Sequence, residues 1–176
     1  MVNVQQIKRP LAPHWFYIAA LGVAGLDQIT KALVLLKIPL GDAGSVPVIP
    51  NVFHLTHVRN TGIAFSMLEG KIPVILLASA LVMIGIVVTE RKSKGTMSVA
   101  SGIALSLPLG GAIGNMIDRL RFGNVVDFID VRVIKFAIFN VADSAITVGI
   151  IWLLLISFFQ PTRGEQVAAS DPQRDT

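Results

Sequence analysis

Four long apolar stretches dominate the pattern of hydrophobic and polar positions along this 176-residue chain. A helix needs about 20 mostly apolar residues to cross the hydrocarbon core of a bilayer. The pattern therefore predicts four membrane-spanning helices, over residues 14–36, 72–90, 97–117 and 137–160. The second stretch is almost free of polar residues, which indicates a packing role, whereas the other three carry polar residues towards one end.

The two longer connections are too polar to cross a membrane. In the first, residues 37–71, prolines and glycines break the chain into turns, and residues 52–58 alternate in a way that predicts a strand or two on the membrane surface. Residues 64–68 are typical of the start of a short interfacial helix, and residues 131–133 in the second connection are again strand-like. We expect one integral-membrane domain over residues 1–160, followed by a disordered tail over 161–176.

The composition agrees with a membrane protein, because only 15% of the residues are charged and 53% are hydrophobic, against about 25% charged in a typical soluble domain. The chain has no cysteine, which excludes disulfides, thiolate metal ligands and thiol nucleophiles. Its net charge is +4, but no basic run with interleaved aromatic residues indicates a nucleic-acid partner. In a membrane chain, basic residues more often set the topology and contact lipid headgroups.

The distribution of basic residues predicts the orientation in the membrane. An even number of spans places both termini on one side, and the basic residues are equally numerous on the two sides. The dense cluster Arg91, Lys92 and Lys94 lies in the very short loop between the second and third spans. Since cytoplasmic loops are enriched in Lys and Arg, we expect cytoplasmic termini and two outward-facing polar connections.

With this topology, the polar residues of three spans fall at a similar depth near the outer face. Asp27 and Lys31 are four residues apart on the first span and can form an ion pair. Residues 140, 143, 144 and 147 of the fourth span follow the spacing of one helical face. Together with Asn115 and Asp118 of the third span, they predict one polar cluster at the outward side.

Two carboxylates are the strongest candidates for chemistry. An Asp near the centre of a bilayer costs roughly 2.5–3.5 kcal/mol on insertion scales, so Asp127 and Asp143 indicate a function. Two adjacent Asp side chains can share one proton and activate water against an amide, which favours a membrane-embedded aspartyl peptidase. The alternatives are helix capping or a salt bridge with Arg119 or Arg132, and spacing alone does not choose between Asp127 and Asp130.

Other classes of protein and site fit the pattern less well. A proton-coupled transporter also places carboxylates within spans, but no inverted repeat is visible. A non-enzymatic assembly factor remains an alternative, and the Gly-x-Gly-Asp motif of presenilin-like proteases is absent. His54 and His57 are metal-ligand candidates without a clear third partner, so surface positions on a strand are favoured and no metal site is predicted.

Five short motifs, in order along the chain, resemble those of the lipoprotein signal peptidases (signal peptidase II). Each motif is modest alone, but together they cover most of residues 14–160. They are Asp27-Gln28-Ile29-Thr30-Lys31, Asn60-Thr61-Gly62-Ile63-Ala64-Phe65, the run of residues 110–119 that ends in Asp118-Arg119, Gly123-Asn124-Val125-Val126-Asp127-Phe128, and Phe139-Asn140-Val141-Ala142-Asp143. One small departure is Ile63, where Ala is common.

The resemblance implies an all-α membrane protein with four transmembrane helices, a small outward-facing β-cradle and a short interfacial helix. It implies a bacterial inner-membrane endopeptidase that cuts diacylglyceryl-modified prolipoproteins just before the lipidated Cys, without a metal or another cofactor. We expect the protein to be monomeric. By the family pattern, Asp127 and Asp143 form the catalytic dyad, and Asp130 is a bystander. The positions that resemble substrate-binding or supporting residues are Asn60, Asn115, Arg119, Asn140, Asp27 and Lys31.

Overall fold

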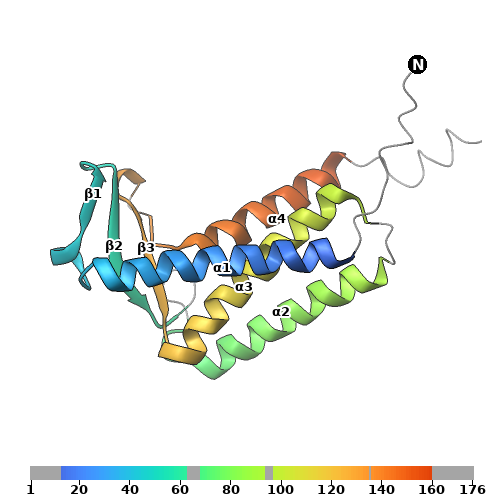
Figure 1. The fold of residues 1–176 in the computed structure, drawn as a ribbon, viewed down its shortest axis with the longest axis horizontal. Coiled ribbons are helices and arrows are strands. Elements are labelled where there is room, and N and C mark those ends of the chain that lie inside the picture. The colour runs from blue at the N-terminus through green and yellow to red at the C-terminus, as the bar shows by residue number, and fades with distance from the viewer. Residues whose placement is uncertain (1–12, 63–67, 94–96, 135, 160–176) are drawn as a thin grey trace, which may run out of the picture.

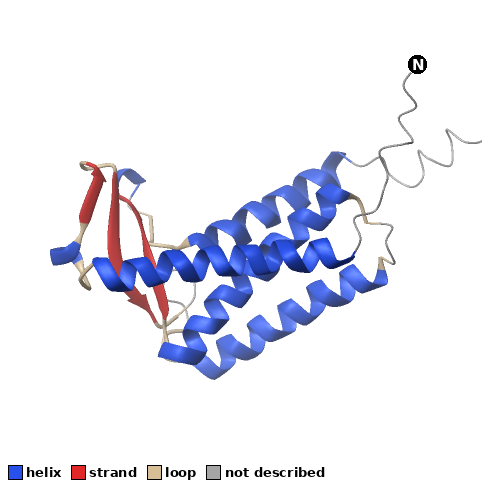
Figure 2. Cartoon of the chain, in the orientation of Figure 1, coloured by secondary structure: helices blue, strands red, loops and turns tan. Residues whose placement is uncertain are grey.

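Four long helices form a bundle with a small sheet at one end (Figures 1 and 2). The computed structural model describes residues 13–62, 68–93, 97–134 and 136–159. The helices are α1 (Pro13–Lys37), α2 (Ile72–Lys92), α3 (Val99–Phe122) and α4 (Val141–Phe159). All four are long and apolar enough to cross a membrane, which confirms the predicted spans. The first residues of α1 and the last of α4 lie at the end away from the sheet (Figure 1).

Two helix boundaries differ from the prediction by more than two residues. Helix α3 continues past residue 117 to Phe122, so Asp118 and Arg119 are helical, and it ends at Gly123, whose φ of 67° is left-handed. Helix α4 begins at Val141, later than predicted, because the side chain of Asn140 accepts the N–H of Asp143 and caps the helix. The apolar residues just before Asn140 instead run beside the sheet, where the carbonyl of Phe139 accepts the N–H of Ile129.

The sheet is antiparallel, in the order β1 (Val46–Ile49), β2 (Phe53–Asn60) and β3 (Val125–Val131). Strand β2 confirms the strand predicted over residues 52–58. The strand predicted over residues 131–133 is wrong, since β3 ends at Val131 and a 3-10 turn over Arg132–Ile134 follows it. Strand β3 is buried along most of its length, so its sequence lacks the alternation of polar and apolar residues that marks a half-exposed strand.

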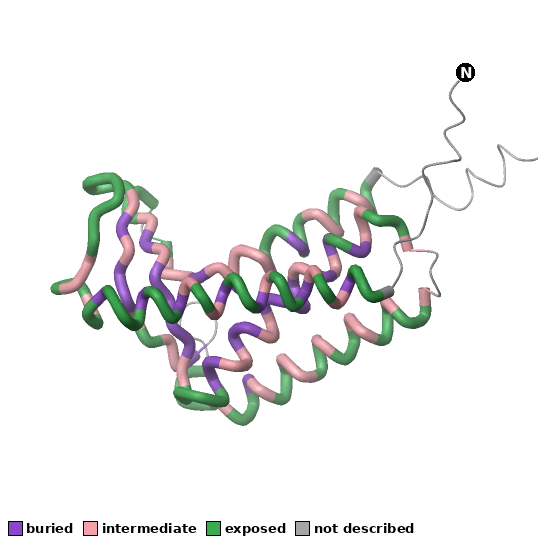
Figure 3. Tube along the Cα trace, viewed as in Figure 1, coloured by how far each residue is buried: buried purple, intermediate pink, exposed green. Residues whose placement is uncertain are grey.

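Helix α3 is the centre of the bundle and the most buried of the helices (Figure 3). Two of its glycines allow close packing on either side. A Cβ atom at Gly111 would collide with the carbonyl of Ala142 on α4, and one at Gly114 would collide with the carboxylate of Asp27 on α1. These two glycines therefore serve the packing of α3 against its neighbours. Helix α2 packs on α3 and exposes apolar side chains such as Leu77 and Leu81.

Two predictions concern residues that the structure does not describe. The short interfacial helix expected from residue 64 falls mostly on residues 63–67, and the tail over 161–176 lies entirely outside the described residues. Both stay predictions.

Candidate active site

A large cavity lies where the sheet meets the helices. Its volume is about 720 Å³, and its walls come from α2, α3, α4, the end of β2, β3 and residues 136–139. Five of the predicted site residues line it, namely Asn60, Asn115, Arg119, Asp127 and Asp143. The chain segment between Asp127 and Asp143 folds back on itself, as it must if the two carboxylates are to face the same space.

Asp127 lies on β3, where it pairs with Val58 of β2, and only 2% of its surface is exposed. Its carboxylate accepts a hydrogen bond from the Nδ2 of Asn60 at 2.9 Å and one from the Nδ2 of Asn140 at 2.7 Å. Burial and the nearby charge of Asp143 raise the pKa of Asp127 to about 7, and these two amide hydrogen bonds only partly offset them. A carboxyl group with this pKa can hold a proton at neutral pH.

Asp143 occupies the first turn of α4 and forms a reciprocal cap with Asn140. The Oδ1 of Asn140 accepts the N–H of Asp143 at 2.9 Å, and the Oδ2 of Asp143 accepts the N–H of Asn140 at 3.2 Å. This arrangement is a capping box, which fixes the start of a helix. The sequence leaves helix capping and catalysis as alternatives for Asp143. In the structure Asp143 caps α4 with one oxygen, and its other oxygen accepts a hydrogen bond from the Nδ2 of Asn115 at 2.8 Å at the cavity wall.

Asn115 connects the cavity to a charged cluster behind it. Its Oδ1 accepts the Nζ of Lys31 at 2.8 Å and the Nδ2 of Asn140 at 3.1 Å. Lys31 also forms ion pairs of 2.9 Å with Asp27, as predicted from their spacing, and with Asp118. All three charged side chains are buried, and neither Asp27 nor Lys31 lines the cavity. These two residues therefore act on the cavity only through their neighbours.

The cluster also fixes the backbone around the cavity. The Oδ1 of Asp27 accepts the N–H of Ala142 in the first turn of α4, and the Oδ2 of Asp118 accepts the N–H of Val126, next to Asp127. Asp118 further accepts the Nε2 of Gln28 at 2.9 Å. The sequence places Asp118 in the polar cluster, but nothing in its spacing indicates that it binds Lys31, Gln28 and the backbone of β3.

Arg119 reaches the cavity from α3. Its Nη2 donates to the carbonyl of Gly62 at 2.9 Å, and its Nη1 donates to the carbonyl of Asn115 at 3.4 Å. Its buried Nε has no partner among the described residues. Arg119 forms no ion pair within the described part of the chain. The alternative of a salt bridge from Arg119 to Asp127 or Asp143 is therefore wrong.

Asp130 belongs to a separate network on the sheet. Its Oδ2 accepts the Oγ1 of Thr56 at 2.7 Å and the Nε of Arg132 at 2.8 Å. Burial alone would raise the pKa of Asp130, but the hydrogen bonds from Thr56 and Arg132 outweigh burial and lower it. Asp130 does not line the cavity, so the structure separates it from Asp127.

The two histidines of β2 lie in the sheet as well. His57 contacts the carbonyl of Ile38 through Nδ1, and His54 contacts the hydroxyl of Ser45. Among the described residues, no group of three or more His, Cys, Asp or Glu side chains is arranged to hold a metal ion.

Helix α2 contributes to the site in a way that its sequence does not indicate. Ala78, Ser79 and Val82 line the cavity together with residues of α4. The second span carries no motif, and small side chains in an apolar helix give no signal that distinguishes a cavity wall from a packing surface.

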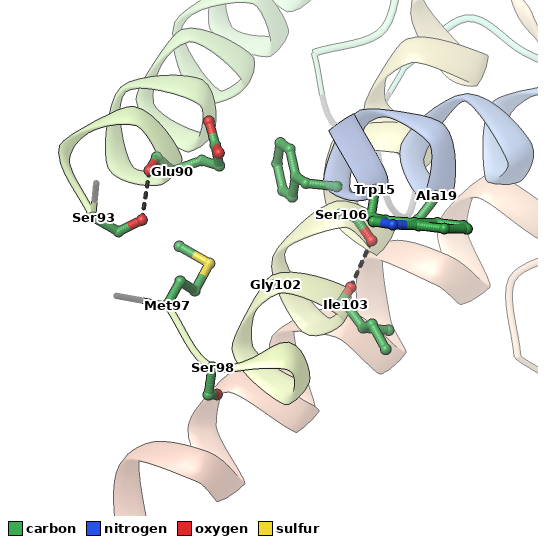
Figure 4. Close-up of a pocket in the computed structure, with 10 residues that line it drawn as sticks. Trp15, Ala19, Glu90, Ser93, Met97, Ser98, Gly102, Ile103 and Ser106 are labelled. Atoms are coloured by element: carbon green, nitrogen blue, oxygen red, sulfur yellow. Dashed lines mark hydrogen bonds between the residues drawn. The ribbon is translucent and has the colours of Figure 1, made fainter. Parts of the chain in front are cut away.

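A second pocket, at the opposite end of the bundle, is much smaller (Figure 4). It lies between α1, α2 and α3 beside Trp15, Glu90 and Met97, and its volume is about 40 Å³. None of the predicted site residues lines it. A space of this size holds about one or two water molecules.

Comparison with known proteins identifies the family. The profile of "Signal peptidase (SPase) II" matches residues 19–159, which is most of the chain. The chain belongs to the signal peptidase II family. Its relatives include the lipoprotein signal peptidase of Brevibacillus brevis, 46% identical over 82% of this chain and 95% of that protein. The lipoprotein signal peptidase of Bacillus subtilis is 43% identical over 80% of this chain and 90% of its own.

Solved structures agree with the fold. A bacterial membrane enzyme determined by the in meso method at 2.3 Å resolution matches with a TM-score of 0.75 and 30% identity, over 93% of both chains. A second, at 1.9 Å resolution, matches with a TM-score of 0.74 and 34% identity, over 85% of this chain and 95% of the other. This member of the family is thus a multi-pass membrane peptidase with a four-helix fold.

Proposed function

We propose that this member of the signal peptidase II family is an aspartyl endopeptidase. Its substrates would be diacylglyceryl-modified prolipoproteins, and it would cut them just before the lipidated Cys. The observation that carries the proposal is that Asp127 and Asp143 line one cavity, with the pKa of Asp127 raised to about 7 by burial and by the charge of Asp143. The names of the relatives, lipoprotein signal peptidases, support the class of substrate.

The chemistry needs one ionised and one protonated carboxyl group. The ionised Asp accepts a proton from water as its oxygen attacks the scissile carbonyl, and the protonated Asp donates to the carbonyl oxygen. Ionising both carboxyl groups would place two negative charges close together, which costs free energy. The two groups therefore lose their protons in two steps that belong to the pair. Asn60, Asn115 and Asn140 supply the amide N–H groups that hold the two carboxylates. We assign Arg119, with its unpartnered buried Nε, to the binding of substrate.

The depth of the cavity suits a lipid-anchored substrate. Along α4 the cavity wall runs from Asp143 to Val148, which at about 1.5 Å per residue is roughly 8 Å. The hydrocarbon core of one leaflet is about 15 Å deep, so the cavity extends from the sheet well into a leaflet. Two acyl chains keep a substrate in the membrane plane, since each buried CH₂ contributes about 0.8 kcal/mol.

The orientation and assembly of the enzyme are part of the proposal. We place the sheet and the cavity at the outer face of the bacterial inner membrane, with both termini in the cytoplasm, because the last turn of α2 carries Arg91 and Lys92 and the short connection after it carries Lys94. One chain supplies every proposed site residue, so we propose that a monomer suffices.

The test is cleavage of a diacylglyceryl-modified prolipoprotein by the purified protein, with the released peptide identified by its mass. We expect wild type to cut before the lipidated Cys, and Asp127→Asn and Asp143→Asn to lose at least about 100-fold in rate, the usual scale for an acid–base catalyst. Both variants should insert and melt as wild type does. Wild-type-like cleavage by either variant would exclude the dyad, whereas no cleavage by well-folded wild type would favour a non-enzymatic assembly factor.

A further inference from the structure

The two carboxyl groups of the cavity have unequal surroundings. Asp127 is 2% exposed, and its hydrogen-bond donors in the described part of the chain are the neutral amides of Asn60 and Asn140. No ion pair joins it to any described residue. A carboxylate charge is costly in buried, uncharged surroundings. Burial is the largest contribution to the raised pKa of Asp127, and attraction to Lys31, which opposes it, is the smallest.

Asp143 is better placed to carry a negative charge. Its side chain is only partly buried, and it lies in the first turn of α4, where the helix dipole stabilises anions. One of its oxygens accepts a backbone N–H, that of Asn140. The guanidinium of Arg119 also attracts Asp143 more strongly than it attracts Asp127. Both carboxyl groups accept two hydrogen bonds, so the number of bonds does not distinguish them, whereas exposure and charge do.

Lys31 determines which way the amide of Asn115 faces. An ammonium group has three donors and no acceptor, and the Nζ of Lys31 lies 2.8 Å from the Oδ1 of Asn115. The Nδ2 of Asn140 also donates to this oxygen, at 3.1 Å. If the amide were rotated by 180°, its NH₂ group would face both donors. The Nδ2 of Asn115 must therefore point to Asp143, to which it donates at 2.8 Å.

From this asymmetry we infer that Asp143 is the ionised base of the dyad, that Asp127 carries the proton, and that Lys31 is a positioning residue that acts on Asp143 through Asn115. The inference rests on the proposed function. In the first step, water gives a proton to Asp143 and its oxygen bonds to the carbonyl carbon, while Asp127 protonates the carbonyl oxygen. In the second step, Asp143 passes its proton to the leaving nitrogen, the C–N bond breaks, and a hydroxyl of the intermediate returns a proton to Asp127.

The division of roles is tested without any cleavage. Infrared spectra of protein labelled with ¹³C at the Asp carboxyl groups report the carbonyl band of protonated acids. At about pH 5.5, above the ordinary range for Asp, we expect a protonated-acid component that disappears in Asp127→Asn and persists in Asp143→Asn. Loss of the component in Asp143→Asn with persistence in Asp127→Asn would reverse the roles and overturn the inference, as would its persistence in both variants.

The role of Lys31 is tested by a charge-balanced variant. Lys31→Met alone would leave Asp27 and Asp118 without their buried partner, but Lys31→Met combined with Asp118→Asn keeps the net charge of the three side chains at one negative. We expect the acid limb of the pH profile to move up by about one pH unit, so that kcat falls by up to about tenfold on that limb and little on the plateau above it. KM should change little, because the cluster does not line the cavity.

Two further variants complete this test. Thr30→Val is the matched control, since among the described residues the hydroxyl of Thr30 bonds only within α1, to the carbonyls of Leu26 and Asp27. We expect its pH profile to match that of wild type. Lys31→Gln, again combined with Asp118→Asn, keeps a donor for Asn115 without the charge, and we expect a smaller shift of the acid limb. A loss of rate that is equal at every pH in the folded variants would make Lys31 merely structural. If wild type cleaves no lipidated prolipoprotein, the proposed function fails while the infrared result still stands.

Discussion

At the scale of single residues, the protonation of Asp127 determines how the rate of the proposed reaction falls at high pH. The acid of the dyad must hold its proton, and burial with the charge of Asp143 raises the pKa of Asp127 to about 7. The protonated fraction is nearly complete well below this pH and falls as the pH rises through it. We therefore expect kcat/KM to decline above about pH 7, by close to tenfold per pH unit, in assays of a lipidated prolipoprotein. A rate that stays constant up to pH 9 would contradict this assignment.

Asp130 is the natural comparison, because it lies three residues away on the same strand. Its partners are Thr56 and Arg132, and it lies outside the cavity. We expect Asp130→Asn to retain most of the cleavage activity. Complete loss of cleavage in a normally folded Asp130→Asn variant would contradict the assignment of Asp127, and not Asp130, to the dyad.

The same variant tests the sign of the pKa shift. In the folded protein, the hydrogen bonds from Thr56 and Arg132 overcome the effect of burial and lower the pKa of Asp130. A lowered carboxyl pKa contributes stability above its unfolded value, and this contribution disappears as the pH falls through the folded value. Asp130→Asn should thus melt below wild type at pH 7, and the difference should close below about pH 4.

The distinction between Asp127 and Asp130 also shows what spacing leaves undetermined. Both lie in β3, and which of them faces the cavity depends on the register with β2, where Asp127 pairs with Val58 and Asp130 with His54. An irregularity in β2 between Leu55 and Val58 shifts that register. No sequence pattern marks this bulge, so only the resemblance to the family separated the two residues.

At the scale of elements, the packing of α1 on α3 depends on Gly114. A Cβ atom there would collide with the carboxylate of Asp27, whose other oxygen accepts the N–H of Ala142. We expect Gly114→Ala to lower the free energy of unfolding by about 1–3 kcal/mol, the usual cost of overpacking, and to reduce activity. Gly22→Ala on α1 is the control, since its Cβ would meet no atom within 4 Å. Equal melting temperatures for the two variants would contradict this role of Gly114.

The existence of the four helices could be predicted from hydropathy, because in a chain this poor in charge a run of about 20 apolar residues is seldom anything but a membrane span. Their ends could not. Residues 137–139 are as apolar as the helix that follows, yet the cap formed by Asn140 and Asp143 excludes them. Similarly, Asp118 and Arg119 look like loop residues, but Lys31 and the carbonyl of Gly62 bind them in the last turns of α3.

At the scale of the whole molecule, the absence of cysteine makes the proposed orientation directly measurable. We expect Asp42→Cys, beside β1, to react with a membrane-impermeant maleimide on intact cells with the outer membrane removed. The side chain of Asp42 is 92% exposed. Arg91→Cys, in the exposed last turn of α2, should react only after the membrane is permeabilised. The opposite pattern would place the termini outside and the cavity on the cytoplasmic side.

The walls of the cavity have a consequence for how the enzyme meets its substrate. Because α2, α3 and α4 are membrane helices, a substrate that reaches the cavity through lipid is already dissolved in the bilayer. Its effective concentration is then a mole fraction in the membrane, not an amount per volume of buffer. A cleaved signal peptide would be apolar as well, and it would remain in the bilayer. Turnover of the proposed substrate would then depend on its surface density in the membrane.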